Sequence, residues 1–203
     1  HAIDEVEVVI VSNELEQFEV RRNVLVLHHE HRLLVWTDGD RCALLDNALF
    51  EVAHLITELR TMARPLIEHN ANSFVLDVPE ELGVMYGDKL RVRQVVLNLL
   101  SNAAKFTSSG TVTLRVAREA LHGGEYVVFE VCDTGIGMTP EQTARIFDKF
   151  TQADVSTTRV YGGTGLGLAI ADEISRVHRA TLTLDTGAQG RGLRVTVLFP
   201  WSL

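Results

Sequence analysis

The feature of this sequence that most restricts its fold is a pair of segments in which apolar and polar residues alternate. The apolar positions are Val112, Leu114 and Val116 in the first segment and Val127, Phe129 and Val131 in the second. A period of two is typical of strands with one buried face. The glycine-containing linker His122-Gly123-Gly124 predicts that the two strands are antiparallel neighbours. The apolar face of such a sheet requires a second layer to cover it.

The covering layer is predicted to be helical. Apolar residues recur at helical spacing over residues 48–69, a second helix is expected from Asp88, as N-cap, to Phe106, and a third follows residue 165. Further strands are predicted at Ser73–Val78, Thr181–Leu184 and Leu193–Phe199. We therefore expect an α/β (α+β) fold, a two-layer sandwich with a mixed, mostly antiparallel sheet and helices packed on one face.

Residues 1–46 differ from the rest and are predicted to form a separate N-terminal segment of unknown role with a β-like pattern. Strand-like runs occur at Val6–Val11, Asn23–Leu27 and Arg32–Trp36. The last run is followed by Thr37-Asp38-Gly39-Asp40, a turn signal that favours a hairpin into Cys42–Leu45. Residues 47–203 are predicted to form the main domain.

Composition excludes several classes of protein. The net charge of −8 argues against nucleic acid as a partner, since phosphate-backbone surfaces need clustered Lys and Arg. No apolar run approaches the roughly 20 residues that span a bilayer, so we expect no direct membrane contact from this chain. The two cysteines, Cys42 and Cys132, do not have metal-ligand spacing and favour a reducing setting. We expect a cytoplasmic protein, or the cytoplasmic part of a membrane-anchored receptor.

The predicted helix 88–106 carries an unusual polar face. Gln94, Asn98, Asn102 and Lys105 lie three or four residues apart and share one side. Asparagine is a poor helix former because its side chain competes for the backbone. Amide oxygens beside an ammonium favour a hard cation next to a phosphate, although an ordinary solvated face is an equal alternative from this helix alone.

Asp133 ends the second alternating strand, in the segment Cys132-Asp133-Thr134-Gly135-Ile136-Gly137. Its parity with Val131 predicts that the carboxylate points toward the core, where a charge needs a hydrogen-bond donor. The amino group of adenine is such a donor, whereas guanine presents a carbonyl there, so Asp133 would select ATP over GTP. Gly135 and Gly137 would let the backbone pass close to a flat base. The alternative is a turn that merely ends the strand.

A helix start and a glycine cluster follow. Thr139-Pro140-Glu141-Gln142 has the pattern of a capping box, and polar residues 151–165 lead through Gly163, Gly165 and Gly167 into the third helix. Free backbone N–H groups at a helix start can hold phosphate oxygens. The cluster lacks the Gly-Lys-Ser/Thr of a Walker loop, and Leu168 occupies the third glycine position of a dinucleotide fingerprint.

Taken together, the segments resemble the four boxes of the ATP-binding catalytic domain of two-component sensor histidine kinases, and the segment from Phe150 to Gly163 is similar to the hybrid, phosphorelay type. The four matching segments are Gln94-Val-Val-Leu-Asn-Leu-Leu-Ser-Asn-Ala-Ala-Lys-Phe-Thr107, Asp133-Thr-Gly-Ile-Gly137, Ile146-Phe-Asp-Lys-Phe150 and Thr158-Arg-Val-Tyr-Gly-Gly-Thr-Gly-Leu-Gly-Leu-Ala-Ile170. The resemblance covers residues 47–200.

The resemblance implies ATP and Mg²⁺ as cofactors and transfer of the γ-phosphoryl group to a histidine. It implies that Asn102 coordinates the metal, that Asn98 contacts metal or phosphates, that Lys105 reaches the phosphates and that Asp133 reads adenine. By this resemblance, the catalytic residues would be the three on the predicted helix 88–106: Asn98, Asn102 and Lys105. The implied nucleotide-binding set adds Asp133, Gly135, Gly137, Phe150, Thr158, Arg159, Gly163, Thr164, Gly165, Leu166, Gly167 and Leu168.

The resemblance also implies partners: a histidine-bearing dimerisation domain, in the full-length protein or in trans, and a downstream response-regulator receiver. Two other functions stay open, a hydrolytic ATPase of the wider gyrase, heat-shock-ninety and mismatch-repair superfamily and a nucleotide-gated interaction module without phosphoryl transfer. Such ATPases place a glutamate where this chain has Asn98, and an amide cannot act as a general base.

Residues 1–46 depart from the resemblance, since they do not match the paired helices that carry the phospho-accepting histidine. His29-Glu30-His31-Arg32 echoes the histidine box, but Leu33-Leu34 replaces the usual Thr-Pro, so His29 is not favoured as the acceptor. His28, His29 and His31 lack a fourth metal ligand. Arg179-Ala180 stands where relatives often have two glycines, which leaves a tight turn there uncertain.

Overall fold

The computed structural model describes most of the chain. The described residues are 18–21, 24–29, 32–37, 41–121, 123–139, 142–143, 166–187 and 190–201, of which 18–45, 166, 167 and 169 are described by their backbone alone. Contacts divide the chain into two compact units, His1–Asn47 and Ala48–Leu203. No helix in these ranges is long and apolar enough to cross a membrane.

The described part of the first unit, from residue 18 on, contains four strands: β1 (Phe18–Arg21), β2 (Val24–His29), β3 (Arg32–Thr37) and β4 (Arg41–Asp46). They form one antiparallel sheet in the order β1-β2-β3-β4, and β3 pairs with β4 from Arg32↔Asp46 to Thr37↔Arg41. The predicted hairpin between Arg32–Trp36 and Cys42–Leu45 is therefore confirmed. The predicted strand Val6–Val11 lies outside the described residues.

In the second unit, the described strands form a five-stranded sheet in the order β10-β11-β9-β8-β6. Its strands are β6 (Ser73–Asp77), β8 (Thr111–Leu121), β9 (Gly124–Asp133), β10 (Thr181–Thr186) and β11 (Leu193–Pro200). All neighbours are antiparallel except β6 and β8, which are parallel. The predicted hairpin is present as β8 and β9, with Gly123 at φ 82° in its turn.

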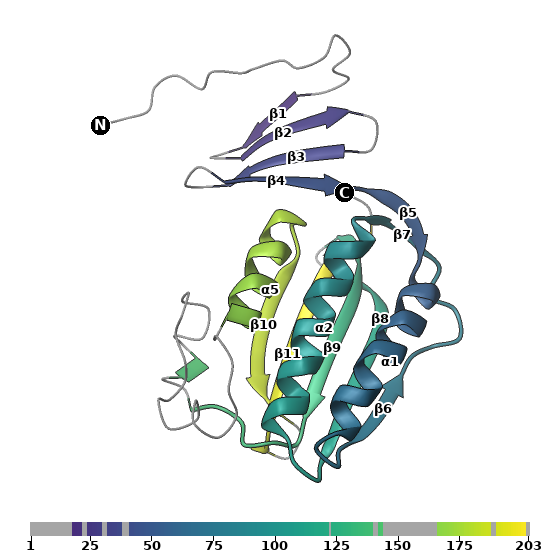
Figure 1. Cartoon of the computed structure of the whole chain (residues 1–203). Coiled ribbons are helices and arrows are strands. Elements are labelled where there is room, and N and C mark those ends of the chain that lie inside the picture. Colours follow the sequence, from purple (N-terminus) through teal and green to yellow (C-terminus); the bar gives the residue numbers. More distant parts are fainter. Residues whose placement is uncertain are drawn as a thin grey trace. The chain divides into compact units, whose positions relative to one another are not determined.

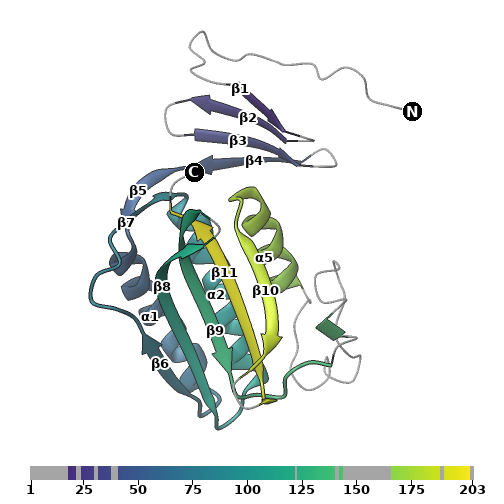
Figure 2. The same cartoon turned by 180° about the vertical axis from the view of Figure 1, so that it is seen from behind.

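Among the described residues, three helices cover one face of this sheet: α1 (Val52–Glu68), α2 (Lys89–Phe106) and α5 (Leu166–Val177). Figure 1 shows α2 between α1 and α5, and Figure 2 shows the opposite face of the sheet, over which no described helix lies. The mixed, mostly antiparallel two-layer sandwich predicted from the sequence is therefore confirmed.

The middle helix is positioned from three sides. Its N-cap is Asp88, as predicted, and the carboxylate accepts a hydrogen bond from Arg91 N at 3.0 Å. The carboxylate of Glu58, on α1, forms ion pairs with Lys89 Nζ at 2.6 Å and with Arg93 Nη1 at 2.8 Å. Seven side chains of α2 are buried in the core: Val92, Val95, Val96, Leu99, Leu100, Ala103 and Ala104. These contacts therefore fix the rotation of α2 about its own axis.

One helix boundary differs from the prediction. The helical pattern was expected from residue 48, but residues 48–51 form strand β5 (Ala48–Glu51), which pairs with β7 (Val84–Gly87). Phe50 is the one buried residue of this strand, whereas Leu49 is 73% exposed. Hydrogen bonds to a strand more than 30 residues away override the local helical spacing.

The turn after α5 forms without glycine. Ala180 N donates to Ser175 O at 2.8 Å, and Arg179 adopts φ 52°, in the left-handed region. This conformation costs a non-glycine residue roughly 1 kcal/mol, so the turn forms with Arg179-Ala180 in place of two glycines at a small loss of stability.

Candidate functional site

The polar face predicted for α2 is present. Gln94, Asn98, Asn102 and Lys105 are all half-buried, in contrast to the fully buried opposite face. Gln94 Oε1 accepts a hydrogen bond from Arg91 Nη1 at 3.2 Å, and Lys105 Nζ lies 5.0 Å from the centre of the Phe106 ring. One helix thus presents two amides and one ammonium at its C-terminal half, a combination suited to a cation beside a phosphate.

Asp133 lies at the last position of β9, opposite Val112 of β8. It is 7% exposed and shares its face with buried Val127, Phe129 and Val131, as the alternation predicted. Its Oδ1 accepts hydrogen bonds from Gly135 N at 2.9 Å and Leu193 N at 3.3 Å. The carboxylate is therefore removed from bulk water but held by two backbone amides.

These surroundings act on the ionisation of Asp133 in opposite directions. Burial raises the pKa of its carboxyl above the ordinary value and is the largest effect. The amides of Gly135 and Leu193, followed by the Thr107 hydroxyl, lower the pKa and partly offset burial. The ionised form therefore depends on a small number of hydrogen-bond donors.

The C-terminal end of α2 lies directly against the segment that follows Asp133. Ile136 N donates to Phe106 O at 3.2 Å. A Cβ atom on Gly135 would lie 2.2 Å from Phe106 O, and one on Gly137, at φ 67°, would lie 3.0 Å from Gly192 O. Both glycines are thus required by packing within the protein, a reason that the sequence interpretation, which assigned them to contact with a base, did not anticipate.

A loop that the sequence interpretation missed completes these surroundings. Gly192, between β10 and β11, has φ 72°, and a Cβ there would lie 1.8 Å from Asp133 O. The next residue, Leu193, supplies the second amide to the Asp133 carboxylate. The signal available in the sequence was the density of glycines at 187, 190 and 192.

Two asparagines outside the predicted site hold the same end of α2. Asn72 is 5% exposed, and its Nδ2 donates to Thr107 O at 2.9 Å and to Ala104 O at 3.3 Å. Its Oδ1 accepts from Gly110 N at 3.0 Å. Asn70 Nδ2 also donates to Ala104 O, at 2.9 Å. The carbonyls of Ala104 and of the C-cap Thr107 are therefore satisfied by the segment that precedes β6.

The capping box predicted after Gly137 is confirmed. Thr139 N donates to Gln142 Oε1 at 2.9 Å, and Gln142 N donates to Thr139 Oγ1 at 3.3 Å. Figure 1 shows that the N-terminal end of α5 lies at the same end of the sandwich as the C-terminal ends of α2 and β9. Leu166, Gly167 and Leu168 belong to the first turn of α5, and Leu168 is buried.

Several predicted residues fall outside the described part of the chain. They are Phe150, Thr158, Arg159, Gly163, Thr164 and Gly165. The side chains of His28, His29 and His31 are likewise not described. Elsewhere in the described ranges, no group of three or more His, Cys, Asp or Glu residues could hold a metal ion.

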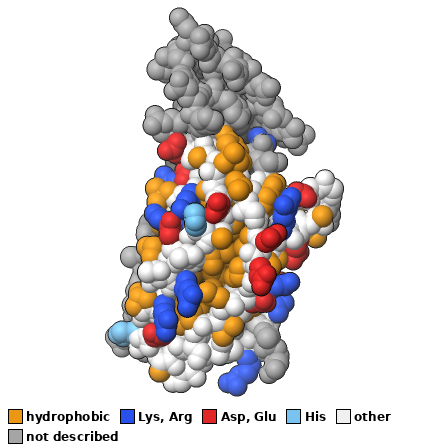
Figure 3. Space-filling view, turned by 90° about the vertical axis from the view of Figure 1, so that its right-hand side faces the viewer, with side chains coloured by type: hydrophobic (Ala, Val, Ile, Leu, Met, Phe, Trp, Pro, Cys, Tyr) orange, Lys and Arg blue, Asp and Glu red, His pale blue; other side chains and the backbone are white. Residues whose placement is uncertain are grey.

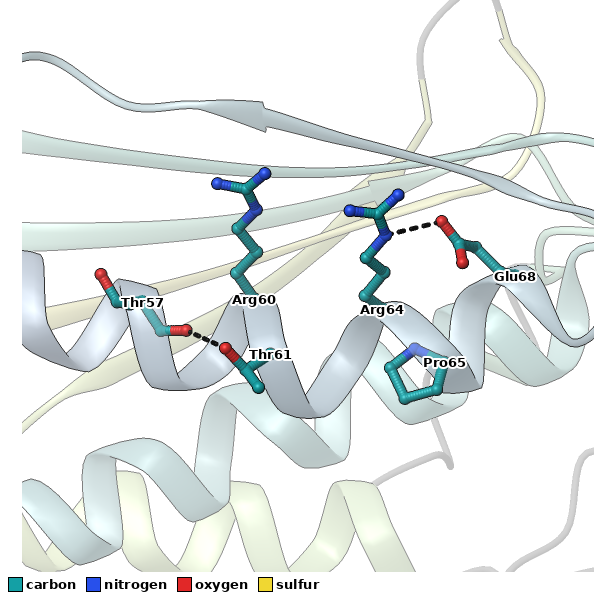
Figure 4. A pocket seen from close by; sticks show the side chains of 6 residues that line it. All are labelled: Thr57, Arg60, Thr61, Arg64, Pro65 and Glu68. Carbon is teal, nitrogen blue, oxygen red and sulfur yellow. Dashed lines mark hydrogen bonds and ion pairs between the residues drawn. The ribbon is translucent and has the colours of Figure 1, made fainter.

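A separate depression lies on the solvent side of α1 and contains none of the predicted site residues. It has a volume of about 450 Å³ and is lined by Thr57, Arg60, Thr61, Arg64, Pro65 and Glu68. Figure 4 shows Arg64 already paired with Glu68, at 2.8 Å, and Thr61 Oγ1 bonded to the Thr57 carbonyl. The side chains of Arg64, Glu68 and Thr61 are thus engaged within α1.

The neighbouring surface is apolar. Figure 3, which faces the side of the second unit that carries α1 and β6, shows hydrophobic side chains gathered in a band. On these two elements the large exposed apolar residues are Met62, Leu66 and Val75. This band is distinct from the polar face of α2.

Comparison with known proteins identifies the family. Residues 87–203 match the family described as histidine kinase-, DNA gyrase B-, and HSP90-like ATPase. The matched range contains α2, the strand β9 that ends at Asp133, and α5. It covers more than half of the chain.

Curated relatives are histidine kinases and sensor kinases. The chain is 43% identical over 126 residues to the circadian input-output histidine kinase CikA of Synechococcus elongatus, a match that covers 62% of this chain and 16% of the relative. It is 32% identical over 203 residues to the autoinducer 2 sensor kinase/phosphatase LuxQ of Vibrio parahaemolyticus, covering 94% of this chain and 24% of the relative. The chain thus spans about a quarter or less of these relatives.

The fold has close counterparts among solved structures. Full-length ShkA in complex with AMPPNP superposes with a TM-score of 0.66 at 32% identity, over 77% of this chain and 31% of that one. Together with the match over residues 87–203, this places the chain in the family of histidine kinase-, DNA gyrase B-, and HSP90-like ATPases.

Proposed function

We propose that this chain is the ATP-binding catalytic domain of a sensor histidine kinase and that it supplies the γ-phosphoryl group of ATP to a histidine on another domain. The observation that supports this most is the position of Asp133, a buried carboxylate held by two backbone amides where α2, β9 and the β10–β11 loop meet. An ionised acceptor in such a site fits the amino group of adenine.

The donor set fits a nucleotide with its metal. Asn102, with Asn98, would hold Mg²⁺ through amide oxygens, and Lys105 would contact the phosphates. Bound Mg²⁺ supplies neutralisation of the phosphate charge during transfer. The N-terminal end of α5 would add backbone N–H groups for phosphate oxygens. The relative ShkA, which has been seen with AMPPNP, supports an adenine nucleotide as the ligand.

The composition of α2 favours transfer to a protein group over hydrolysis. The helix from Lys89 to Phe106 contains no Asp or Glu. Water attack needs a group that can accept its proton, and neither Asn98 nor Asn102 can do so. A histidine delivered by another domain brings its own nucleophilic nitrogen. We propose that the histidine-bearing domain is a dimerisation domain, and that the phosphoryl group then passes from its histidine to a response-regulator receiver.

Binding of ADP to the Asp133→Asn variant tests the site. An amide presents an N–H group where the adenine amino group needs an acceptor, so the affinity should fall by about ten- to a hundredfold, the range for a hydrogen bond to a charged group. Isothermal titration calorimetry measures it. Asp77→Asn is the matched control, because Asp77 lies at the exposed end of β6 with its side chain 70% exposed. Equal affinities in both variants would refute the assignment of adenine recognition to Asp133.

The reaction itself is tested with γ-labelled ATP and a separate histidine-bearing helical domain. Label on histidine supports the proposal. Release of free phosphate without labelled histidine would indicate the hydrolytic alternative, and tight binding without turnover would indicate a nucleotide-gated interaction module.

A further inference from the structure

One buried side chain outside the family-matched range is bonded toward both halves of the proposed nucleotide site. The match covers residues 87–203, and Asn72 lies before it, directly ahead of β6. Asn72 is 5% exposed, and both polar atoms of its side chain form hydrogen bonds. A buried amide engaged through both atoms holds its partners in one arrangement, because water cannot easily replace a lost bond there.

The nitrogen of this amide holds the end of α2. Asn72 Nδ2 donates to Thr107 O at 2.9 Å and to Ala104 O at 3.3 Å. Ala104 is the residue before Lys105, and Asn102 lies two positions earlier on the same helix. The two hydrogen bonds are therefore made to the turn that carries the proposed ligands of the metal and the phosphates.

The oxygen of the same amide holds the backbone that leads into β8. Asn72 Oδ1 accepts from Gly110 N at 3.0 Å. The next residue, Thr111, donates its N–H to Thr134 Oγ1 at 2.9 Å, and its carbonyl accepts from Thr134 N at 3.1 Å. Thr134 directly follows Asp133. Asn72 is thus connected to the proposed adenine acceptor through hydrogen bonds and backbone.

The two halves of the site leave little room for movement at this point. A Cβ atom on Gly110 would collide with the side chains of both Thr107, at the end of α2, and Thr134, beside the adenine acceptor. The backbone next to Asn72 is fixed as well, since Ser73 N donates to Gly110 O at 2.8 Å. Asn72 therefore cannot shift toward one half of the site without breaking a bond to the other.

We propose that Asn72 is a positioning residue for the nucleotide: it sets the spacing between the end of α2, which would hold Mg²⁺ and phosphate, and the segment at Asp133, which would read adenine. This inference rests on the proposed function. A ligand that spans both halves, such as ADP with Mg²⁺, gains affinity from the correct spacing, because both sets of contacts then form at once. Adenosine contacts the adenine-reading half alone and does not depend on that spacing.

The test compares these two ligands on the unaltered chain and on Asn72→Ala, with NMR titrations that also measure weak binding. Asn72→Ala should bind ADP with Mg²⁺ about tenfold more weakly, the loss of roughly one hydrogen bond to a charged group, and should keep its adenosine affinity within about twofold. A purely structural role would lower both affinities by one common factor, because only the folded fraction of the chain binds. The ratio of the two affinities therefore separates positioning from stability.

Met85→Ala is the matched control. Met85 is 2% exposed and lies on β7, which ends just before α2 begins and is therefore at the opposite end of that helix. Its truncation destabilises the unit by leaving a cavity. The ratio of the two affinities should nevertheless equal that of the unaltered chain.

An unchanged ratio in Asn72→Ala, or an equal change in Met85→Ala, would overturn the inference. If Asn72→Ala does not fold by circular dichroism, Asn72→Ser takes its place, since a single hydroxyl cannot make all three hydrogen bonds; an unchanged ratio in the Ser variant overturns the inference likewise. Absence of ADP binding by the unaltered chain would refute the proposed function as well. ADP binding by the unaltered chain with an unchanged ratio in the variants refutes this inference alone.

Discussion

Replacing Asn72 by alanine should destabilise the second unit more than its position outside the site indicates. The side chain makes three hydrogen bonds, to Ala104 O, Thr107 O and Gly110 N, and it is 5% exposed. Truncation removes all three partners at once. It leaves the Thr107 carbonyl and the Gly110 amide without these partners in a place that water reaches poorly, and it leaves Ala104 O with Asn70 Nδ2 alone.

The expected magnitude follows from these contacts. A hydrogen bond contributes about 1 kcal/mol net, so the loss of three predicts about 3 kcal/mol for Asn72→Ala. For a protein of this size, a melting temperature falls by about 2–4 °C per kcal/mol, which gives roughly 6–12 °C. Asn72→Asp should cost at least as much, because a carboxylate oxygen would then face the carbonyls of Ala104 and Thr107.

Urea unfolding followed by circular dichroism at 222 nm measures this effect, because the described helices all lie in the second unit. Asn70→Ala is the control. Asn70 is half-buried and shares the Ala104 carbonyl with Asn72, so its loss should cost about 0.5–1 kcal/mol. A cost below about 1 kcal/mol for Asn72→Ala would refute the reasoning that these three hydrogen bonds hold the end of α2.

Two further predictions concern the β10–β11 loop and the end of α5. Gly192→Ala should lower the free energy of unfolding by more than about 3 kcal/mol and weaken ADP binding, since its Cβ would lie 1.8 Å from Asp133 O. Gly190 has φ 75° and open space around it, so Gly190→Ala should lower the free energy of unfolding by only about 1 kcal/mol. Equal urea midpoints for the two variants would contradict this. Burial lowers the pKa of His178 below 6.5, so the unfolded chain binds the proton more readily than the folded chain, and stability should fall as pH drops below about 6.5. His178→Gln should flatten this pH dependence of stability, and an unchanged pH profile in that variant would count against the prediction.

Local signals in the sequence predicted much of the second unit. The alternating segments correspond to β8 and β9, Asp88 caps α2, and Thr139 and Gln142 form reciprocal hydrogen bonds. Each of these features depends on residues close together in the chain, such as a cap and the amide three residues later. Periodicity and capping patterns report that kind of interaction well.

The helical pattern from residue 48 failed for the converse reason. Residues 48–51 have a spacing compatible with a helix, and their partner β7 is not a neighbour in sequence. The reason for Gly135 was likewise missed. It is required by the Phe106 carbonyl, which approaches from another element.

The identity of the chemical groups was therefore readable from the chain alone: a polar helix face with two amides and an ammonium, and an acid at the end of a buried strand. The environment of that acid was not. Asp133 receives its second amide from Leu193, 60 residues away, and Thr107 is held by Asn72, 35 residues away. Hydrogen bonds between distant segments depend on how the layers pack, and no local pattern encodes which backbone amide will face a given carboxylate.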